Sequence, residues 1–199
     1  MPKFVLGSGS HSRLALIRQA GFEPDIIEPA DIDETQLKKE KPLDYVKRVS
    51  AEKCHFLHKK YYGEVILTAD SIGETRGMIL RKAHTDEDVE KYMKLMSGKN
   101  VKLITSVCLI NSEHKFSQKT ISTSIKFKHF NDLDIQEYIK SKEGLEKAGG
   151  IMIEGMAESY VIKIVGSYSN IMGLPLYQTR NMLISAGIKS KYKSTYEIN

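Results

Sequence analysis

The order of apolar runs along the chain constrains its fold more than any other feature. In the first half, strand-like runs at residues 4–6 and 65–69 alternate with segments of helical periodicity, the longest of which is 42–63. In the second half, strand-like runs follow one another more closely. The other expected strands are residues 101–110, 121–129, 151–153 and 160–165, and the other expected helices are residues 14–20, 85–97, 132–139 and 175–187. This order predicts an α/β fold with a mixed, twisted sheet flanked by helices.

The length of 199 residues suits a single domain, residues 1–199, or two lobes that share a core. A content of 41% hydrophobic and 28% charged residues excludes collagen, coiled coil and wholesale disorder. No apolar run approaches the ~18–20 residues that cross a bilayer, and the N-terminus lacks the pattern of a signal peptide. We therefore expect a cytoplasmic protein with no membrane partner, in which Cys54 and Cys108 are reduced thiols.

The formal charge of +5 is spread along the chain rather than gathered in one stripe. Basic residues alternate with acidic ones, as in Lys38-Lys39-Glu40-Lys41, and the densest basic cluster lies in residues 189–199, an expected flexible tail. Nucleic-acid-binding proteins concentrate Lys and Arg on one face. We therefore expect no direct nucleic-acid binding, and the alternative use of the charge is a positive pocket for phosphate.

The first strand-like run breaks into a loop, Gly7-Ser8-Gly9-Ser10, that precedes a helix. Backbone N–H groups of such a loop and of the helix N-terminus point the same way, so they form an anion site, which Arg13 would reinforce. The motif is neither a P-loop nor a complete dinucleotide fingerprint, because Ser12 stands where the third glycine belongs. A simple tight turn between strand and helix is the alternative.

Carboxylates and lysines elsewhere in the chain are further candidates. Asp70 directly follows the strand-like run 65–69, and α/β folds place ligands at strand ends. The polar stretch 24–40 is an expected loop, whose acidic part, Asp31-Ile32-Asp33-Glu34, either offers oxygen ligands to a hard cation or caps a helix. Lys53 and Lys82, taken singly, are typical of solvated lysines.

Together, these segments resemble the Maf (septum formation inhibitor) family, nucleotide pyrophosphatases with a fold related to the inosine triphosphatase group. The resemblance extends from Val5 to Gly187. It rests on the order and spacing of Leu6-Gly7-Ser8-Gly9-Ser10 with Arg13, Ala51-Glu52-Lys53, Thr68-Ala69-Asp70-Ser71, Lys147-Ala148-Gly149-Gly150, Ile153-Glu154-Gly155 and Gly166-Ser167-Tyr168-Ser169-Asn170.

The resemblance implies hydrolysis of a nucleoside triphosphate to the monophosphate and pyrophosphate, in a cleft between two lobes of a homodimeric protein. Asp70 is then the base that orients and deprotonates the attacking water. Glu34 and Asp70 together would position a divalent metal, Mg²⁺ in first place and Mn²⁺ as the alternative. The substrate-binding residues implied by the same resemblance are Ser8, Ser10, Arg13, Lys53, Lys82 and Glu154.

Three segments depart from the family pattern. The opening loop reads Ser10-His11-Ser12-Arg13 where the family has Ser-Pro-Arg-Arg, so one cation and a stiffening proline are missing. The segment Arg81-Lys82-Ala83 replaces Gly-Lys-Pro but keeps the lysine. Glu154 stands where pyrimidine-specific members carry Gln, and an ionised Glu only accepts hydrogen bonds. Glu154 is therefore expected to disfavour the carbonyl edge of thymine or uracil and to tolerate an amino-bearing base.

Two other function classes remain open from the sequence. The altered opening loop and Glu154 favour a catalytically weak nucleotide-binding regulator of cell division, which would bind nucleotides without releasing pyrophosphate. The Gly7-Ser8-Gly9 turn alone favours a dinucleotide-binding oxidoreductase, although the later motifs argue against that reading.

Overall fold

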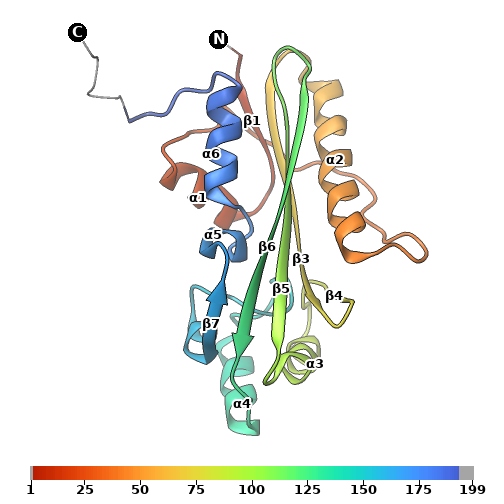
Figure 1. Ribbon diagram of the computed structural model, residues 1–199, viewed down its shortest axis with the longest axis vertical. Helices are drawn as coiled ribbons and strands as arrows, with labels where there is room; N and C mark the ends of the chain where they lie inside the picture. The colour runs from red at the N-terminus through yellow and green to blue at the C-terminus, as the bar shows by residue number, and fades with distance from the viewer. Residues whose placement is uncertain (1, 193–199) are drawn as a thin grey trace.

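A computed structural model describes residues 2–192 of the chain, and in this range the strands form one seven-stranded sheet (Figure 1). The strand order is β2-β1-β3-β5-β6-β7, and β4 pairs with β3 outside this path. The strands are β1 (Phe4–Gly7), β2 (Ile26–Ile27), β3 (Val65–Thr75), β4 (Met78–Leu80), β5 (Asn100–Ile110), β6 (Phe116–Phe127) and β7 (Val161–Val165).

The sheet is mixed, as the sequence predicts. Strand β1 pairs in parallel with β2 and β3, whereas the pairs β3–β5, β5–β6 and β6–β7 are antiparallel. The long β3, β5 and β6 run from the upper half of the molecule into the lower half and connect the two (Figure 1). The predicted α/β class with a mixed sheet flanked by helices is confirmed.

Helices cover both faces of the sheet at one end and a single face at the other. They are α1 (His11–Gln19), α2 (Pro42–Lys60), α3 (Asp86–Met96), α4 (Asp132–Ser141), α5 (Tyr168–Ile171), α6 (Leu176–Ser185) and a 3₁₀ turn at Met156–Tyr160. Helices α1 and α6 lie on one side of the strands and α2 on the other (Figure 1). Proline at the first position of α2 and reciprocal capping boxes at Thr85 and Asn131 begin three of these helices where the sequence indicates.

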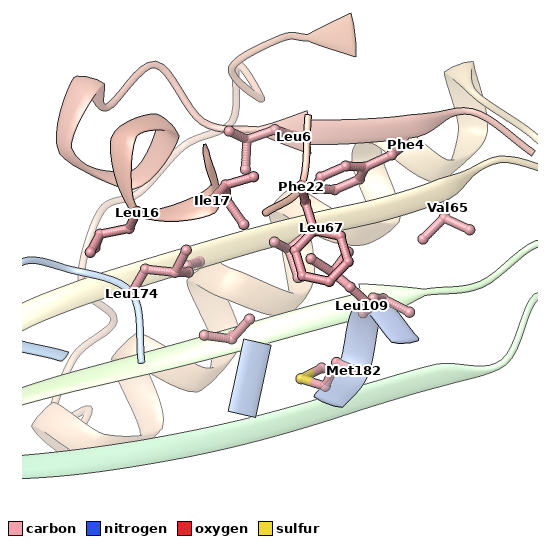
Figure 2. Packing of buried hydrophobic residues seen from close by; sticks show 13 residues of the cluster. Phe4, Leu6, Leu16, Ile17, Phe22, Val65, Leu67, Leu109, Leu174 and Met182 are labelled. Atoms are coloured by element: carbon pink, nitrogen blue, oxygen red, sulfur yellow. The ribbon is translucent and has the colours of Figure 1, made fainter. Parts of the chain in front are cut away.

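The alternation of strand side chains divides the upper core into two layers. Leu6 and Leu67 point toward α1 and α6, whereas their neighbours Val5 and Ile66 point toward α2. Figure 2 shows the first layer, where Phe22 and Met182 close the space between β3 and the helices. A second cluster fills the lower half, where α3, α4 and the 3₁₀ turn pack against the other ends of β5 and β6.

Several sequence expectations are wrong in detail. Residues 151–153 form no strand, because the Met152 N–H bonds to the Tyr138 hydroxyl rather than to a neighbouring strand. The expected loop 24–40 contains the short strand β2, and the polar residues after Asp70 continue β3, since β5 and β4 pair with them. Asp70 therefore lies within a strand rather than at its end.

Other expectations concern the tail, the thiols and the membrane. Lys191 donates its backbone N–H to the Gly21 carbonyl, so the start of the expected tail lies against α1's C-terminal turn, while residues 193–199 lie outside the described residues. Cys54 and Cys108 are buried free thiols, and burial raises their pKa values to about 12 and about 11. None of the helices in the described range combines the length and apolarity needed to cross a membrane.

Candidate active site

A cavity of about 940 Å³ lies where β1 ends and the sheet opens. Its polar end is formed by the loop after β1, by β3 and by α2, and its apolar end by side chains of α3, β5 and β6. Every site residue singled out from the sequence lines this cavity: Ser8, Ser10, Arg13, Glu34, Lys53, Asp70, Lys82 and Glu154. Residues spread over most of the chain thus converge on one place, although their convergence does not test their roles.

The end of β1 creates the opening beside Asp70. The parallel pairing of β1 with β3 stops at Gly7 and Thr68, so Asp70 lies just beyond the last paired residue. Gly7 is required there, because a Cβ at this position would lie 2.5 Å from atoms of Leu57 and Thr68. Because the neighbouring strand has ended, Asp70 lines the cavity although it lies within β3 and is largely buried.

The loop between β1 and α1 is shaped by its own serines. The Ser8 hydroxyl accepts the Ser10 N–H at 3.2 Å, and the Ser10 hydroxyl accepts the Arg13 N–H at 3.4 Å as the N-cap of α1. These bonds hold the chain in a tight curve around the N-terminus of α1. The partial positive charge of that terminus faces the cavity.

Lys53 bridges two carboxylates of the cavity, those of Asp70 and Glu34. Its ammonium on α2 lies 3.0 Å from Asp70 Oδ1 on β3 and 2.8 Å from Glu34 Oε2 in the acidic loop. Lys53 and Asp70 expose only 9% and 8% of their surfaces, whereas Glu34 is exposed. Burial of a charged pair is costly unless both members are partnered, so this bridge holds helix, strand and loop in one arrangement.

Side chains of α2 also hold the loop that carries Glu34. The Tyr45 hydroxyl donates to the Glu34 carbonyl at 3.0 Å. Arg48 donates to both Glu40 oxygens and to the Thr35 carbonyl, and its hydrogen bond with Glu40 raises the pKa of its guanidinium. Sequence analysis missed Tyr45 and Arg48 as contributors to the site. Their position on α2, about two turns before Lys53 for Tyr45 and about one turn for Arg48, is the signal that could have found them.

Arg13 is tied to the protein rather than free in the cavity. Its Nε donates to the Gly173 carbonyl at 2.9 Å, Nη1 to the Ala69 carbonyl at 2.8 Å, and Nη2 to the Ser71 hydroxyl at 3.0 Å. Burial lowers the pKa of the Arg13 guanidinium, and the charges of Asp70 and Glu34 partly offset that effect. Arg13 thus joins α1, β3 and the turn before α6, directly behind Asp70.

Lys82 enters the cavity from the opposite wall. Its segment pairs with the glycine-rich segment 145–150 through bridges of Lys82 to Ala148 and of Ala83 to Leu145. Gly149 and Gly150 both adopt left-handed backbone angles, φ 68° and 66°, which explains two adjacent glycines. His84 and Glu146, 2.7 Å apart, add an exposed pair at the rim that the sequence did not suggest.

Glu154 lies exposed on the same wall, in a turn that the side chains of Tyr138 and Glu143 hold in place. The Met152 N–H donates to the Tyr138 hydroxyl at 3.0 Å, and the Met156 N–H donates to Glu143 Oε2 at 2.7 Å. Tyr138 is fully buried, and burial raises its pKa to about 12, so its hydroxyl stays protonated. The turn thus has a rigid base, while the Glu154 carboxylate itself faces the cavity.

The cavity offers two carboxylates to a divalent cation, those of Glu34 and Asp70. Within residues 2–192, no group of three or more His, Cys, Asp or Glu side chains could hold a metal ion. Glu34 and Asp70 nevertheless point at one common position, which Lys53 marks. Carboxylate oxygens suit Mg²⁺, which is typically held by one or two of them together with water and substrate phosphates. The residues present therefore fit a metal that arrives with a phosphate ligand.

Comparison with known proteins finds relatives that match nearly the whole chain. A protein from Rhodopseudomonas palustris (strain BisB18) named dTTP/UTP pyrophosphatase is 42% identical over 192 residues, which cover 94% of this chain and 93% of the relative. A protein of the same name from Mesorhizobium japonicum is 42% identical over 195 residues, which cover 95% and 94%.

A solved structure and a family model complete the comparison. A HAM1 protein from Coxiella burnetii overlaps with 93% of this chain and 100% of its own, at 16% identity and a TM-score of 0.46. The family model described as Maf-like protein matches residues 3–186, which confirms the resemblance seen in the motifs. The chain therefore belongs to the Maf-like protein family.

Proposed function

We propose that this protein hydrolyses a nucleoside triphosphate to the nucleoside monophosphate and pyrophosphate. The observation that carries the proposal is the Asp70–Lys53–Glu34 bridge at the polar end of a cavity that also receives Lys82 and the N-terminus of α1. A volume of about 940 Å³ suits a nucleotide-sized ligand. The names of the relatives at 42% identity support the same reaction.

In the proposed reaction, water cuts the anhydride between the α- and β-phosphates. Asp70 accepts a proton from the water as it attacks, and pyrophosphate leaves. The positive charges of Lys53 and Lys82 and the hydrogen-bond donors of Ser8 and Ser10 bind the phosphate oxygens, where negative charge must be held. Arg13 acts from behind this site, as a fixed charge that keeps Asp70 and the serine loop in place.

Glu34 and Asp70 would hold the divalent metal, which we propose to be Mg²⁺, with Mn²⁺ as the alternative. When bound, it neutralises phosphate charge and so favours attack on the anhydride. The fit rests on the two carboxylates that converge beside the proposed phosphate site.

We propose a dTTP- or UTP-like substrate, or a modified nucleotide, on the strength of the relatives' names. The apolar end of the cavity, lined by Leu103, Ile125 and Phe127, offers a surface for the base. Glu154 at this wall accepts hydrogen bonds only, so it favours a base that presents an amino group. Base preference is therefore expected to differ from that of a Gln-bearing member.

Pyrophosphate release from a panel of triphosphates tests the proposal. The panel includes dTTP, UTP, CTP, GTP, 7-methyl-GTP and pseudouridine triphosphate, each with Mg²⁺ and with Mn²⁺. Release that disappears in Asp70→Asn supports the enzyme. Nucleotide binding without release would instead support the catalytically weak regulator, a reading favoured by the occupied N–H groups of Arg13 and the altered loop before it. We also propose a homodimer, which light scattering in solution would test.

A further inference from the structure

Lys53 stands where Asp70 and Glu34 would otherwise meet. Its ammonium lies within 3.0 Å of one carboxylate and 2.8 Å of the other, and it is largely shielded from water. Two neighbouring carboxylates repel each other, and an ammonium between them removes that repulsion. The same point is the one at which a divalent cation would contact both carboxylates.

In the described part of the chain, no other cationic side chain pairs with these two carboxylates. Lys53 alone forms an ion pair with Asp70 or Glu34 among residues 2–192. Arg13 lies nearby, but its guanidinium donates to Gly173, Ala69 and Ser71 instead. Loss of the Lys53 charge would therefore leave the carboxylates without a direct counter-ion.

We propose that Lys53 is an internal competitor for the divalent cation, which makes metal binding depend on the nucleotide. This inference rests on the proposed function of the same site. In the protein alone, Lys53 holds both carboxylates and keeps metal affinity low. When a triphosphate enters, its oxygens offer Lys53 a new partner, and the two carboxylates become available to the cation. Metal and nucleotide are thereby coupled, and each strengthens the binding of the other.

Mn²⁺ binding to the full chain without nucleotide, followed by electron paramagnetic resonance of the free ion, tests this directly. Lys53→Gln removes the charge but keeps a hydrogen-bond donor, and it is expected to bind Mn²⁺ about tenfold more tightly than wild type. Glu34→Gln is expected to bind it more weakly. An affinity of Lys53→Gln equal to or below that of wild type would overturn the inference.

A matched control separates this site from a general charge effect. Lys60 lies on the same helix and pairs with Glu28 at 2.6 Å, on the outside of the protein. Lys60→Gln changes the net charge by the same amount and is expected to leave Mn²⁺ affinity unchanged. Lys53→Arg keeps the charge and is expected to stay within about threefold of wild type. Equal tightening in Lys60→Gln would count against the competitor role.

Coupling is measured with α,β-methylene-UTP, in which a methylene group replaces the oxygen between the α- and β-phosphates, so that the proposed reaction cannot cleave it. It should tighten Mn²⁺ binding in wild type, and most of that gain should be absent in Lys53→Gln. The measurements on the protein alone need no hydrolysis, so the two proposals can fail separately. Tighter Mn²⁺ binding by Lys53→Gln without any pyrophosphate release in wild type would retain the competitor and reject the enzyme. Pyrophosphate release by wild type without tighter Mn²⁺ binding by Lys53→Gln would retain the enzyme and reject the competitor.

If repulsion between Asp70 and Glu34 prevents Lys53→Gln from folding by itself, the effect of Mn²⁺ on the folding of this variant still tests the inference. Circular dichroism with added Mn²⁺ then answers the question, because a ligand that binds only the folded state stabilises it. Folding restored by Mn²⁺ supports the inference. A chain that stays unfolded at millimolar Mn²⁺ overturns it.

Discussion

The two walls of the cavity are built in different ways. The first wall, formed by α1, α2, β1 and β3, carries charged side chains that are bonded to other parts of the protein, such as Arg13, Lys53 and Asp70. The second wall, formed by residues 81–84 and 145–154, holds its backbone firmly but leaves the side chains of Lys82 and Glu154 exposed. A fixed arrangement of charge suits the phosphate chemistry, whereas exposed side chains on a rigid backbone suit the selection of different bases.

The largest expected effect comes from breaking the first wall at Asp70. Asp70→Asn removes the proton acceptor and one partner of Lys53 but keeps the shape of the side chain. The rate of pyrophosphate release is expected to fall about a thousandfold. Nucleotide affinity, measured by calorimetry, is expected to change far less. Activity close to wild type would show that another group accepts the proton.

Arg13→Met tests whether the hydrogen bonds of Arg13 stabilise the first wall of the cavity. It removes the Arg13 donor to the Ala69 carbonyl and one of the two donors to the Gly173 carbonyl, the other being the Ser71 hydroxyl, so the free energy of unfolding is expected to fall by about 2–4 kcal/mol. Urea denaturation measures this. Arg18→Met, which breaks an exposed pair with Glu23, is the matched control and is expected to lower the free energy of unfolding far less than Arg13→Met. An equal fall in the free energy of unfolding in both variants would show that Arg13 has no special structural role.

Glu154→Gln addresses the second wall without touching the first. A Gln amide both donates and accepts, so the ratio of kcat/KM for UTP over CTP is expected to rise about tenfold. The free energy of unfolding should change by less than about 0.5 kcal/mol, because Glu154 is exposed. An unchanged ratio would mean that Glu154 does not contact the base.

Tyr138→Phe has the smallest expected effect on activity. It removes a hydrogen bond that holds the turn of the second wall, which carries Glu154. It removes the acceptor of the Met152 N–H, which costs about 1 kcal/mol of stability. The UTP-to-CTP ratio should move by a few-fold, while kcat for the better substrate stays within about twofold of wild type. A uniform loss of kcat with every base would mean that the two walls are not separable.

Local patterns along the chain predicted most elements of the fold. The N-terminal caps of α3 and α4 and the apolar periodicity of α2 depend on neighbours a few residues away, and these helices begin where expected. The failures at 151–153 and after Asp70 have a different cause. Each depends on a partner distant in sequence, Tyr138 for Met152 and β5 for the second half of β3.

The candidate site divides in the same way. The family resemblance selected Asp70, Glu34 and the cations, and the structure places all of them around one cavity, while their roles stay predictions. The resemblance did not reveal that Arg48 and Tyr45 hold the Glu34 loop, or that Arg13 spends its N–H groups on the protein. Hydrogen bonds between distant segments leave no local pattern in a single sequence.

By itself, the sequence determined the mixed α/β class, the family and the set of chemical groups available to the site. Only the tertiary structure decided which groups are bonded to the protein and which face the cavity. The physical reason is that propensity and periodicity act over a few residues, whereas the Lys53 bridge joins Glu34 and Asp70 across three elements of the fold. That packing decides whether each charged side chain is bonded within the protein or faces the cavity, where a ligand could bind it.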